Sequence, residues 1–137
     1  MPFTNDLTMQ VTTFLMFAGE AEAAMRCYTS LLPDSRIESL ERYAAGEDGP
    51  EGTIKRSAVV LAGTRYMFFD SPVKHAFGFT PAISLFVDCD GKEQLESIAA
   101  KLGEGGSFLM PAANYGFSRW FCWLQDRWGV SWQLNLP

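Results

Sequence analysis

The stretch Ser131-Trp-Gln-Leu-Asn-Leu136 is the part of the chain that decides the fold, because polar and apolar residues alternate along it without a break. Successive side chains of a β-strand point to opposite faces of a sheet. The apolar face, expected under a helix, would hold Trp132, Leu134 and Leu136. The polar face would hold Ser131, Gln133 and Asn135. Such a polar face suits hydrogen bonding to a ligand, and an ordinary solvated face is the alternative.

Elements upstream of this strand complete a βαβββ unit. Gly129 marks a turn back to a strand at 119–125, and further strands are expected at 81–87 and 107–110. Between these two lies an amphipathic helix, since apolar residues recur there at helical spacing. Asp90 is its expected N-cap. The apolar stripe of this helix consists of Leu95, Ile98, Ala99 and Leu102.

The first half of the chain repeats the same order of elements. Its strands are expected at 10–17, 36–43, 53–61 and 65–70, the last two joined by a hairpin at Gly63-Thr64. A helix follows Gly19 and ends at Pro33, because proline cannot continue the helical hydrogen bonds. The apolar stripe includes Met25, Tyr28 and Leu32, and the matching residues Leu95, Ile98 and Leu102 each lie 70 positions later.

This repeat predicts an α+β fold in which two βαβββ modules form a cupped sheet with the helices outside. Module one would cover about residues 9–70, a linker 71–80, and module two about 81–137, within a single domain of 137 residues. The side chains of Thr13, Ser84 and Gln133 are expected to face the inside of the cup.

Composition and charge exclude several classes of protein. The net charge is −5 and the 11 basic residues are scattered, so no basic face for nucleic acid is expected. No apolar run approaches the roughly 18 residues that span a bilayer, and residues 1–6 show no secretory signal pattern. Three cysteines without CxxC spacing, Cys27, Cys89 and Cys122, are expected to be reduced and inert in a cytoplasmic protein.

His75 is the single histidine, so any acid–base chemistry by imidazole near neutral pH has to use it. It lies in the linker, and Asp70 ends the strand that precedes the linker. The two are candidate catalytic residues, with Asp70 orienting the ring. A histidine that is merely exposed or packed is the alternative.

The loop expected at 109–119 is a candidate for ligand binding. Arg119 presents a planar fork that suits a carboxylate or phosphate. Tyr115 and Trp123 would supply the aromatic surface that is common in small-molecule pockets. An anionic or aromatic ligand is therefore expected here, and a well-packed loop with Arg119 ion-paired at the surface is the alternative.

Several stretches of the chain carry a family resemblance. They are Phe14-Leu-Met-Phe-Ala-Gly19, Gly49-Pro-Glu-Gly-Thr53, Phe79-Thr-Pro-Ala-Ile-Ser84, Tyr115-Gly-Phe-Ser118 and Gly129-Val-Ser-Trp-Gln-Leu134. The chain resembles the PhnB-like branch, also called the 3-demethylubiquinone-9 3-methyltransferase domain, of the vicinal oxygen chelate superfamily. This superfamily includes glyoxalase, bleomycin resistance and extradiol dioxygenase folds. The resemblance implies a glyoxalase-like cupped sheet and a homodimer.

The resemblance also implies where a metal ion would bind. Metal-dependent members of the superfamily use four ligands, usually His and Glu, and the matching positions here are Thr13, Met67, Ala82 and Gln133, the first two to within one residue. Alanine has no ligand atom, and thioether sulfur is a poor partner for a hard or borderline cation. No metal site and no cofactor are therefore expected.

The methyltransferase label finds no support in the residues. Common adenosylmethionine-dependent enzymes present a glycine-rich turn after the first strand of an α/β sheet, whereas Gly19 stands alone here. We expect a metal-free small-molecule-binding protein, and an enzyme of lyase, isomerase or glyoxalase type using His75 and Asp70 is the alternative. The expected ligand contacts are Thr13, Met67, Ser84, Tyr115, Arg119, Trp123, Ser131, Gln133 and Asn135.

Overall fold

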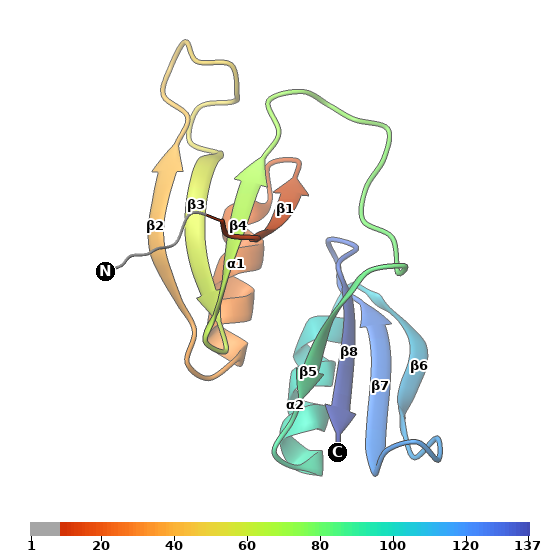
Figure 1. The fold of residues 1–137 in the computed structure, drawn as a ribbon. Coiled ribbons are helices and arrows are strands. Elements are labelled where there is room, and N and C mark those ends of the chain that lie inside the picture. Colours follow the sequence, from red (N-terminus) through yellow and green to blue (C-terminus); the bar gives the residue numbers. More distant parts are fainter. Residues whose placement is uncertain (1–8) are drawn as a thin grey trace, which may run out of the picture. The chain divides into compact units, whose positions relative to one another are not determined.

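The computed structural model describes residues 9–137, which form two compact units that divide between Lys74 and His75. Each unit has one helix and one four-stranded sheet (Figure 1). The first contains β1 (Thr13–Phe17), α1 (Ala21–Leu31), β2 (Arg36–Arg42), β3 (Ile54–Leu61) and β4 (Thr64–Asp70). The second contains β5 (Ser84–Asp88), α2 (Lys92–Gly103), β6 (Ser107–Ala113), β7 (Trp120–Gln125) and β8 (Ser131–Leu136). Residues 1–6, whose sequence lacks a secretory signal pattern, lie outside the described part.

The two sheets have the same strand order, which confirms the predicted repeat and the α+β class. The first sheet runs β1-β4-β3-β2 and the second β5-β8-β7-β6. In each, the first and last strands of the module are parallel neighbours, and the remaining pairs are antiparallel. Each unit is therefore a βαβββ module with an open sheet and not a closed barrel.

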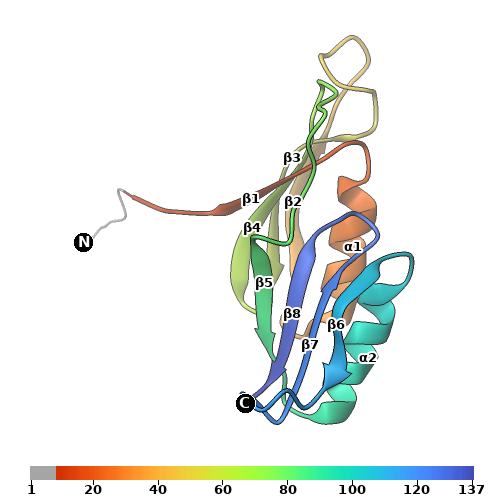
Figure 2. The same ribbon diagram turned by 90° about the vertical axis from the view of Figure 1, so that its right-hand side faces the viewer.

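Each helix covers one face of its own sheet, as Figure 2 shows. The apolar stripes predicted for the helices are confirmed, since all of these side chains are buried: Met25, Tyr28 and Leu32 in the first unit, and Leu95, Ile98, Ala99 and Leu102 in the second. From the sheets, Phe68 and Trp132 are the largest buried rings opposite these stripes. Within the described chain, no helix has the length and apolar character needed to cross a membrane.

The hairpin glycines lie where the sequence places them, and backbone geometry explains why. Between β3 and β4, Leu61 pairs with Thr64, so that Ala62 and Gly63 alone form the turn. Their φ angles are 48° and 84°, a pair of positive values that a two-residue hairpin turn of the primed type requires. Gly129, before β8, has φ 91°. Glycine accepts this conformation without a steric cost.

Three strand boundaries differ by three residues from the sequence-based prediction, and the others by no more than one. β1 begins at Thr13 and β5 at Ser84, and the residues expected before them lie outside the ladders, those at 81–83 in a turn. β6 is longer than expected and continues through Ala113, which shortens the loop expected from residue 109. Pro111 is tolerated inside it because β6 is an edge strand, and the register with β7 shifts around it.

The N-cap of α2 was also predicted one residue too early. Gly91 occupies the N-cap position, with extended φ and ψ. Asp90 precedes it, and its backbone N–H donates to Oε1 of Gln94 at 2.7 Å. A side chain from the first turn therefore reaches back to the chain before the helix, as in a capping box.

Candidate functional site

The polar side of β8 and its neighbours form one hydrogen-bonded network in the second unit. The indole N–H of Trp123 donates to Oγ of Ser131 at 2.9 Å. The hydroxyls of Ser131 and Ser84 are 2.7 Å apart, and Nε2 of Gln133 donates to Oγ of Ser84 at 3.2 Å. We call these four residues the amide–serine face.

Strand register explains why these four side chains meet. Ser84 pairs with Ser131 across β5 and β8, and Trp123 pairs with Gln133 across β7 and β8. Cross-strand partners point to the same side of a sheet. Trp132 points the other way and is 1% exposed, so the predicted orientation of β8 is confirmed.

The hydrogen bonds of this network leave polar groups for a ligand. Ser131 is 1% exposed and already accepts the Trp123 N–H, so its hydroxyl is best placed to donate a hydrogen bond to Oγ of Ser84. Ser84 then accepts two hydrogen bonds, and its hydroxyl proton remains available. Gln133 keeps its second N–H and its Oε1, neither of which bonds to any other described residue. The face therefore offers two donors and one acceptor.

An aromatic wall lies beside the amide–serine face. Phe121, on the same side of β7 as Trp123, has ring contacts with Phe86 at 6.5 Å, Phe117 at 4.9 Å and Tyr115 at 6.3 Å between centroids. Phe86 is 57% exposed and Phe117 64% exposed. We call these four residues the aromatic wall. Phe121 is buried at its base, while Phe86, Phe117 and Tyr115 offer apolar surface to a flat molecule next to a polar network.

Asn135, the third polar residue on the predicted ligand side of β8, forms its hydrogen bond outside the amide–serine face. Nδ2 of Asn135 donates to Oδ1 of Asp88 at 2.8 Å, and register pairs the two residues. Asp88 lies on the same side of β5 as Ser84 and Phe86, because these residues are two apart. The structure thus adds Phe86, Asp88 and Phe121 to the site. These residues could have been found from the sequence, because each lies two or four residues from Ser84 or Trp123 and so shares its side of the sheet.

The predicted loop residues are only partly at this face. The Tyr115 ring joins the aromatic wall, and its hydroxyl donates to the carbonyl of Pro111. The Arg119 side chain is exposed and uses its Nε to bind the carbonyl of Pro137 at 2.6 Å. Trp120 points to the helix side, where its indole N–H donates to Glu96 and Lys92 lies over its ring at 3.9 Å.

Thr13 and Met67 lie in the first unit, on β1 and β4. Register pairs Thr13 with Tyr66 and Met67 with Phe14, so that the two side chains point to opposite sides of the sheet. Thr13 shares its side with the buried Leu15, which pairs with Phe68 on the side of the sheet that α1 covers. The prediction that Thr13 faces away from the helix is therefore wrong. Phe14, one residue on, occupies the side of Met67.

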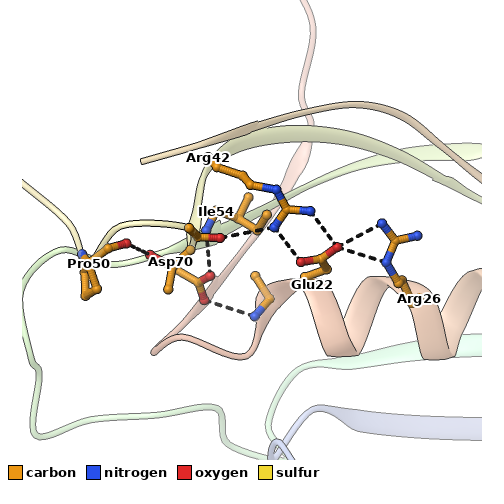
Figure 3. A network of polar contacts seen from close by, with 9 residues as sticks. Glu22, Arg26, Arg42, Pro50, Ile54 and Asp70 are labelled. Atoms are coloured by element: carbon orange, nitrogen blue, oxygen red, sulfur yellow. Dashed lines mark hydrogen bonds and ion pairs between the residues drawn. The ribbon is translucent and has the colours of Figure 1, made fainter. Parts of the chain in front are cut away.

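Asp70, a predicted catalytic residue, is 1% exposed and fastens three parts of the first unit together. Its Oδ1 accepts the backbone N–H groups of Gly19 at 2.8 Å and Ala21 at 3.0 Å. Its Oδ2 accepts that of Ile54 at 2.9 Å (Figure 3). A cavity of about 300 Å³ lies beside it. The carboxylate uses both oxygens on backbone donors, which is the arrangement of a structural anchor.

A second charged cluster stands next to this anchor. Glu22 accepts hydrogen bonds from both terminal nitrogens of Arg42, at 2.6 and 2.8 Å, and from Nε of Arg26 at 3.0 Å (Figure 3). These hydrogen bonds, those from Arg42 first, lower the pKa of Glu22 to about 2. The cluster ties α1 to the end of β2.

His75, the other predicted catalytic residue, is exposed and stacks on the ring of Phe77 at 4.6 Å. The cysteines differ in accessibility. Cys89 and Cys122 are buried, and burial raises the pKa of both thiols, that of Cys122 to about 11. Cys27 is half-buried on α1.

Comparison with known proteins places this geometry in a family. The family model of the 3-demethylubiquinone-9 3-methyltransferase matches residues 9–135. The chain belongs to this family. The PhnB-like family that the residues of β1 and β8 predict is therefore confirmed. No curated protein matches the chain.

Solved structures support the family and its fold. The PhnB protein of Bacillus cereus, described with the same methyltransferase name, is 47% identical with a TM-score of 0.92, over 94% of this chain and all of that one. Protein PA1353 of Pseudomonas aeruginosa is 25% identical with a TM-score of 0.81, over 95% and 98%. A glyoxylase/bleomycin resistance protein/dioxygenase domain of Frankia sp. is 17% identical with a TM-score of 0.63, over 96% and 98%, and shows the shared fold.

The residues of this PhnB-like chain do not fit the metal ion that the superfamily implies. Of the four matching positions, Ala82 has no donor atom and lies in the turn before β5. Met67 offers a thioether, and Thr13 points to the helix side. Gln133 is left as a neutral amide that already donates to Ser84. In the described part of the chain, no three His, Cys, Asp or Glu side chains gather to form a metal site.

Proposed function

We propose that this protein binds a small organic molecule directly, without a metal ion, on the amide–serine face of its second unit. The observation that supports this most strongly is the network of Ser84, Ser131 and Trp123 with Gln133. It fixes the Gln133 amide in place while leaving one N–H and one oxygen of that amide unused. A group that is held in position beforehand loses little entropy on binding.

The side chains around the face support binding over catalysis. The aromatic wall gives apolar area, and no predicted catalytic residue lies on these strands. Asp70, the proposed partner of His75 in an enzyme, already accepts three backbone N–H groups and is 1% exposed. The methyltransferase name of the Bacillus cereus relative would require a cofactor site, and Gly19 is the sole glycine between β1 and α1.

The test starts with a ligand screen. Aromatic fragments are screened by thermal shift, and the strongest is titrated by calorimetry into wild type and Gln133→Leu. We expect Gln133→Leu to keep the fold and to weaken binding by about 1–3 kcal/mol, the cost of leaving a buried polar partner unmatched. Gln94→Leu on α2 serves as the matched control. Equal affinities for wild type and Gln133→Leu would place the site elsewhere.

Metal independence is tested separately. Calorimetry with Ni²⁺, Zn²⁺ and Mn²⁺ should show no site tighter than about 100 µM, or roughly −5.5 kcal/mol. A stoichiometric metal ion that survives dialysis against a chelator would contradict the proposal.

We also propose that the protein works as a homodimer. β1 pairs only with β4, so that one edge of it is open within the described structure. Apolar side chains next to this edge are exposed, Met9 by 84% and Val11 by 96%. Open edges of this kind pair readily with another chain. Light scattering at tens of micromolar should give twice the mass of the 15.3 kDa chain, and a monomer mass would overturn the dimer.

A further inference from the structure

The charge on the amide–serine side of the second sheet comes from one residue. Asp88 lies at the end of β5, on the side of Ser84 and Phe86, and its carboxylate forms no hydrogen bond with the four residues of the amide–serine face. Its Oδ1 accepts from Asn135, while no described residue forms an ion pair with it. A carboxylate without a cation beside a neutral hydrogen-bonding network favours a positively charged partner.

The geometry points to a flat aromatic molecule with a cationic amine at one end and a carbonyl at the other as the ligand of this face. This assignment deepens the proposed function and rests on it. The amine would bind Asp88, the ring would lie on the aromatic wall, and the carbonyl would accept from Ser84 and Gln133.

The spacing of the three parts fits such a molecule. Gln133 and Asn135 are two residues apart on β8, or about 6.6 Å at the rise of a β-strand. Register sets Phe86 opposite Gln133 and Asp88 opposite Asn135. The exposed ring of Phe86 therefore lies between the hydrogen-bonding end and the charged end. An aromatic face also attracts a cation directly.

Anionic ligands are disfavoured because the basic residues of this unit are used elsewhere. Lys92 and Lys101 belong to α2, which covers the opposite side of the sheet. Arg127 stacks on Trp128 at 4.2 Å, in the turn before β8. Arg119, which the sequence suggested as an anion site, binds the carbonyl of Pro137. Asp88 would repel an anion and leave it without a partner.

Three benzamides with the same core test the inference on the whole chain. They are para-(aminomethyl)benzamide, which is cationic, para-ethylbenzamide, which is neutral, and para-carbamoylbenzoate, which is anionic. Each is titrated at millimolar concentration while two-dimensional NMR spectra follow the indole N–H of Trp123 and the side-chain amides of Gln133 and Asn135. We expect the cation to bind about three- to fivefold tighter than the neutral compound, the size of one partly screened charge pair.

Two variants separate the role of Asp88 from overall charge. Asp88→Asn should abolish the preference for the cation over para-ethylbenzamide. Asp90→Asn, with the same change in net charge two residues later, should keep the preference. In wild type, high salt should reduce the preference for the cationic compound, because salt screens the charge pair.

The outcomes distinguish the two proposals. If the benzamides shift Trp123 and Gln133 but the neutral or anionic compound binds as tightly as the cation, the inference is wrong and the binding face stands. If no benzamide shifts these signals, the proposed function itself fails at this face. If the signals of Trp123 and Gln133 change with protein concentration alone, the face binds a second copy of the chain. That result would overturn both the proposed ligand-binding face and the cationic ligand.

Discussion

The carboxylate of Asp70 on β4 accepts the backbone N–H of Ala21 at 3.0 Å and so holds the first turn of α1 against the sheet from 49 positions away. The first N–H groups of a helix have no partner within the helix. In this chain no side chain of α1 caps them, and Asp70 supplies the acceptor from a neighbouring strand. One buried carboxylate thereby joins α1, β3 and β4.

Replacing Asp70 by asparagine should destabilise the protein without changing its shape. In the Asp70→Asn variant the nitrogen of the new side-chain amide would face a backbone N–H, so that one buried donor loses its acceptor. We expect a loss of about 1–3 kcal/mol in the free energy of unfolding, measured with urea. Asp48→Asn, in the exposed loop before β3, removes the same charge and should cost far less. Similar losses in both variants would show that net charge, and not this anchor, is responsible.

Glu22 should make stability depend on acid pH. Its pKa is lowered from 4.5 to about 2 in the folded protein, chiefly by Arg42 and then by Arg26. A carboxylate whose pKa is lower in the folded than in the unfolded protein stabilises the fold, and it does so fully at pH values above the unfolded pKa. For Glu22 this stabilisation is lost as the pH falls from 4.5 through about 2. Because the pair is partly exposed, we expect about 1 kcal/mol at pH 7.

The measurement compares wild type with Glu22→Gln in urea at several pH values. The difference between them should be constant above about pH 5 and shrink towards zero near pH 2. Glu51→Gln, a change in the neighbouring loop, is the control and should track wild type throughout. A difference between wild type and Glu22→Gln that grew on acidification would contradict the prediction.

The three thiols should react in a fixed order. Cys89 and Cys122 are buried and their pKa values are raised, so that little thiolate forms at neutral pH. Cys27 is half-buried on α1 and should be alkylated first in the native protein. Mass spectrometry after iodoacetamide treatment would locate the label. Rapid modification of Cys122 without unfolding would rule this order out, and Cys27→Ser should leave no quickly reacting thiol.

Ser131 should be needed for the order of the amide–serine face. In Ser131→Ala the indole N–H of Trp123 and the hydroxyl of Ser84 lose their partner, at a cost of about 1–3 kcal/mol in unfolding free energy. The indole N–H signal of Trp123 should move in the NMR spectrum. Ser131→Thr retains the hydroxyl and should restore that signal. Ser97→Ala on the exposed side of α2 should alter neither stability nor the indole signal.

Local patterns in the sequence were enough to predict the elements and the repeat. The helix stripe that contains Tyr28, the turn at Gly63 and the alternation around Gln133 each reflect the geometry of a few neighbouring residues. Periodicity of 3.6 or 2 residues and positive φ at a glycine are properties of short segments. The two modules, their helices and the polar side of β8 therefore followed from the chain alone.

The contacts between distant residues were decided only by the tertiary structure. Asp88 meets Asn135, and Ser84 meets Ser131, across 47 positions. A shift of one residue in register moves every side chain to the other side of the sheet, and no local pattern fixes it. For this reason the sequence placed Thr13 on the wrong side and did not reveal that Asp70 anchors three backbone N–H groups. Only long-range packing sets Asp70 against the start of α1 and brings Phe86, Phe121 and Asp88 to the candidate site.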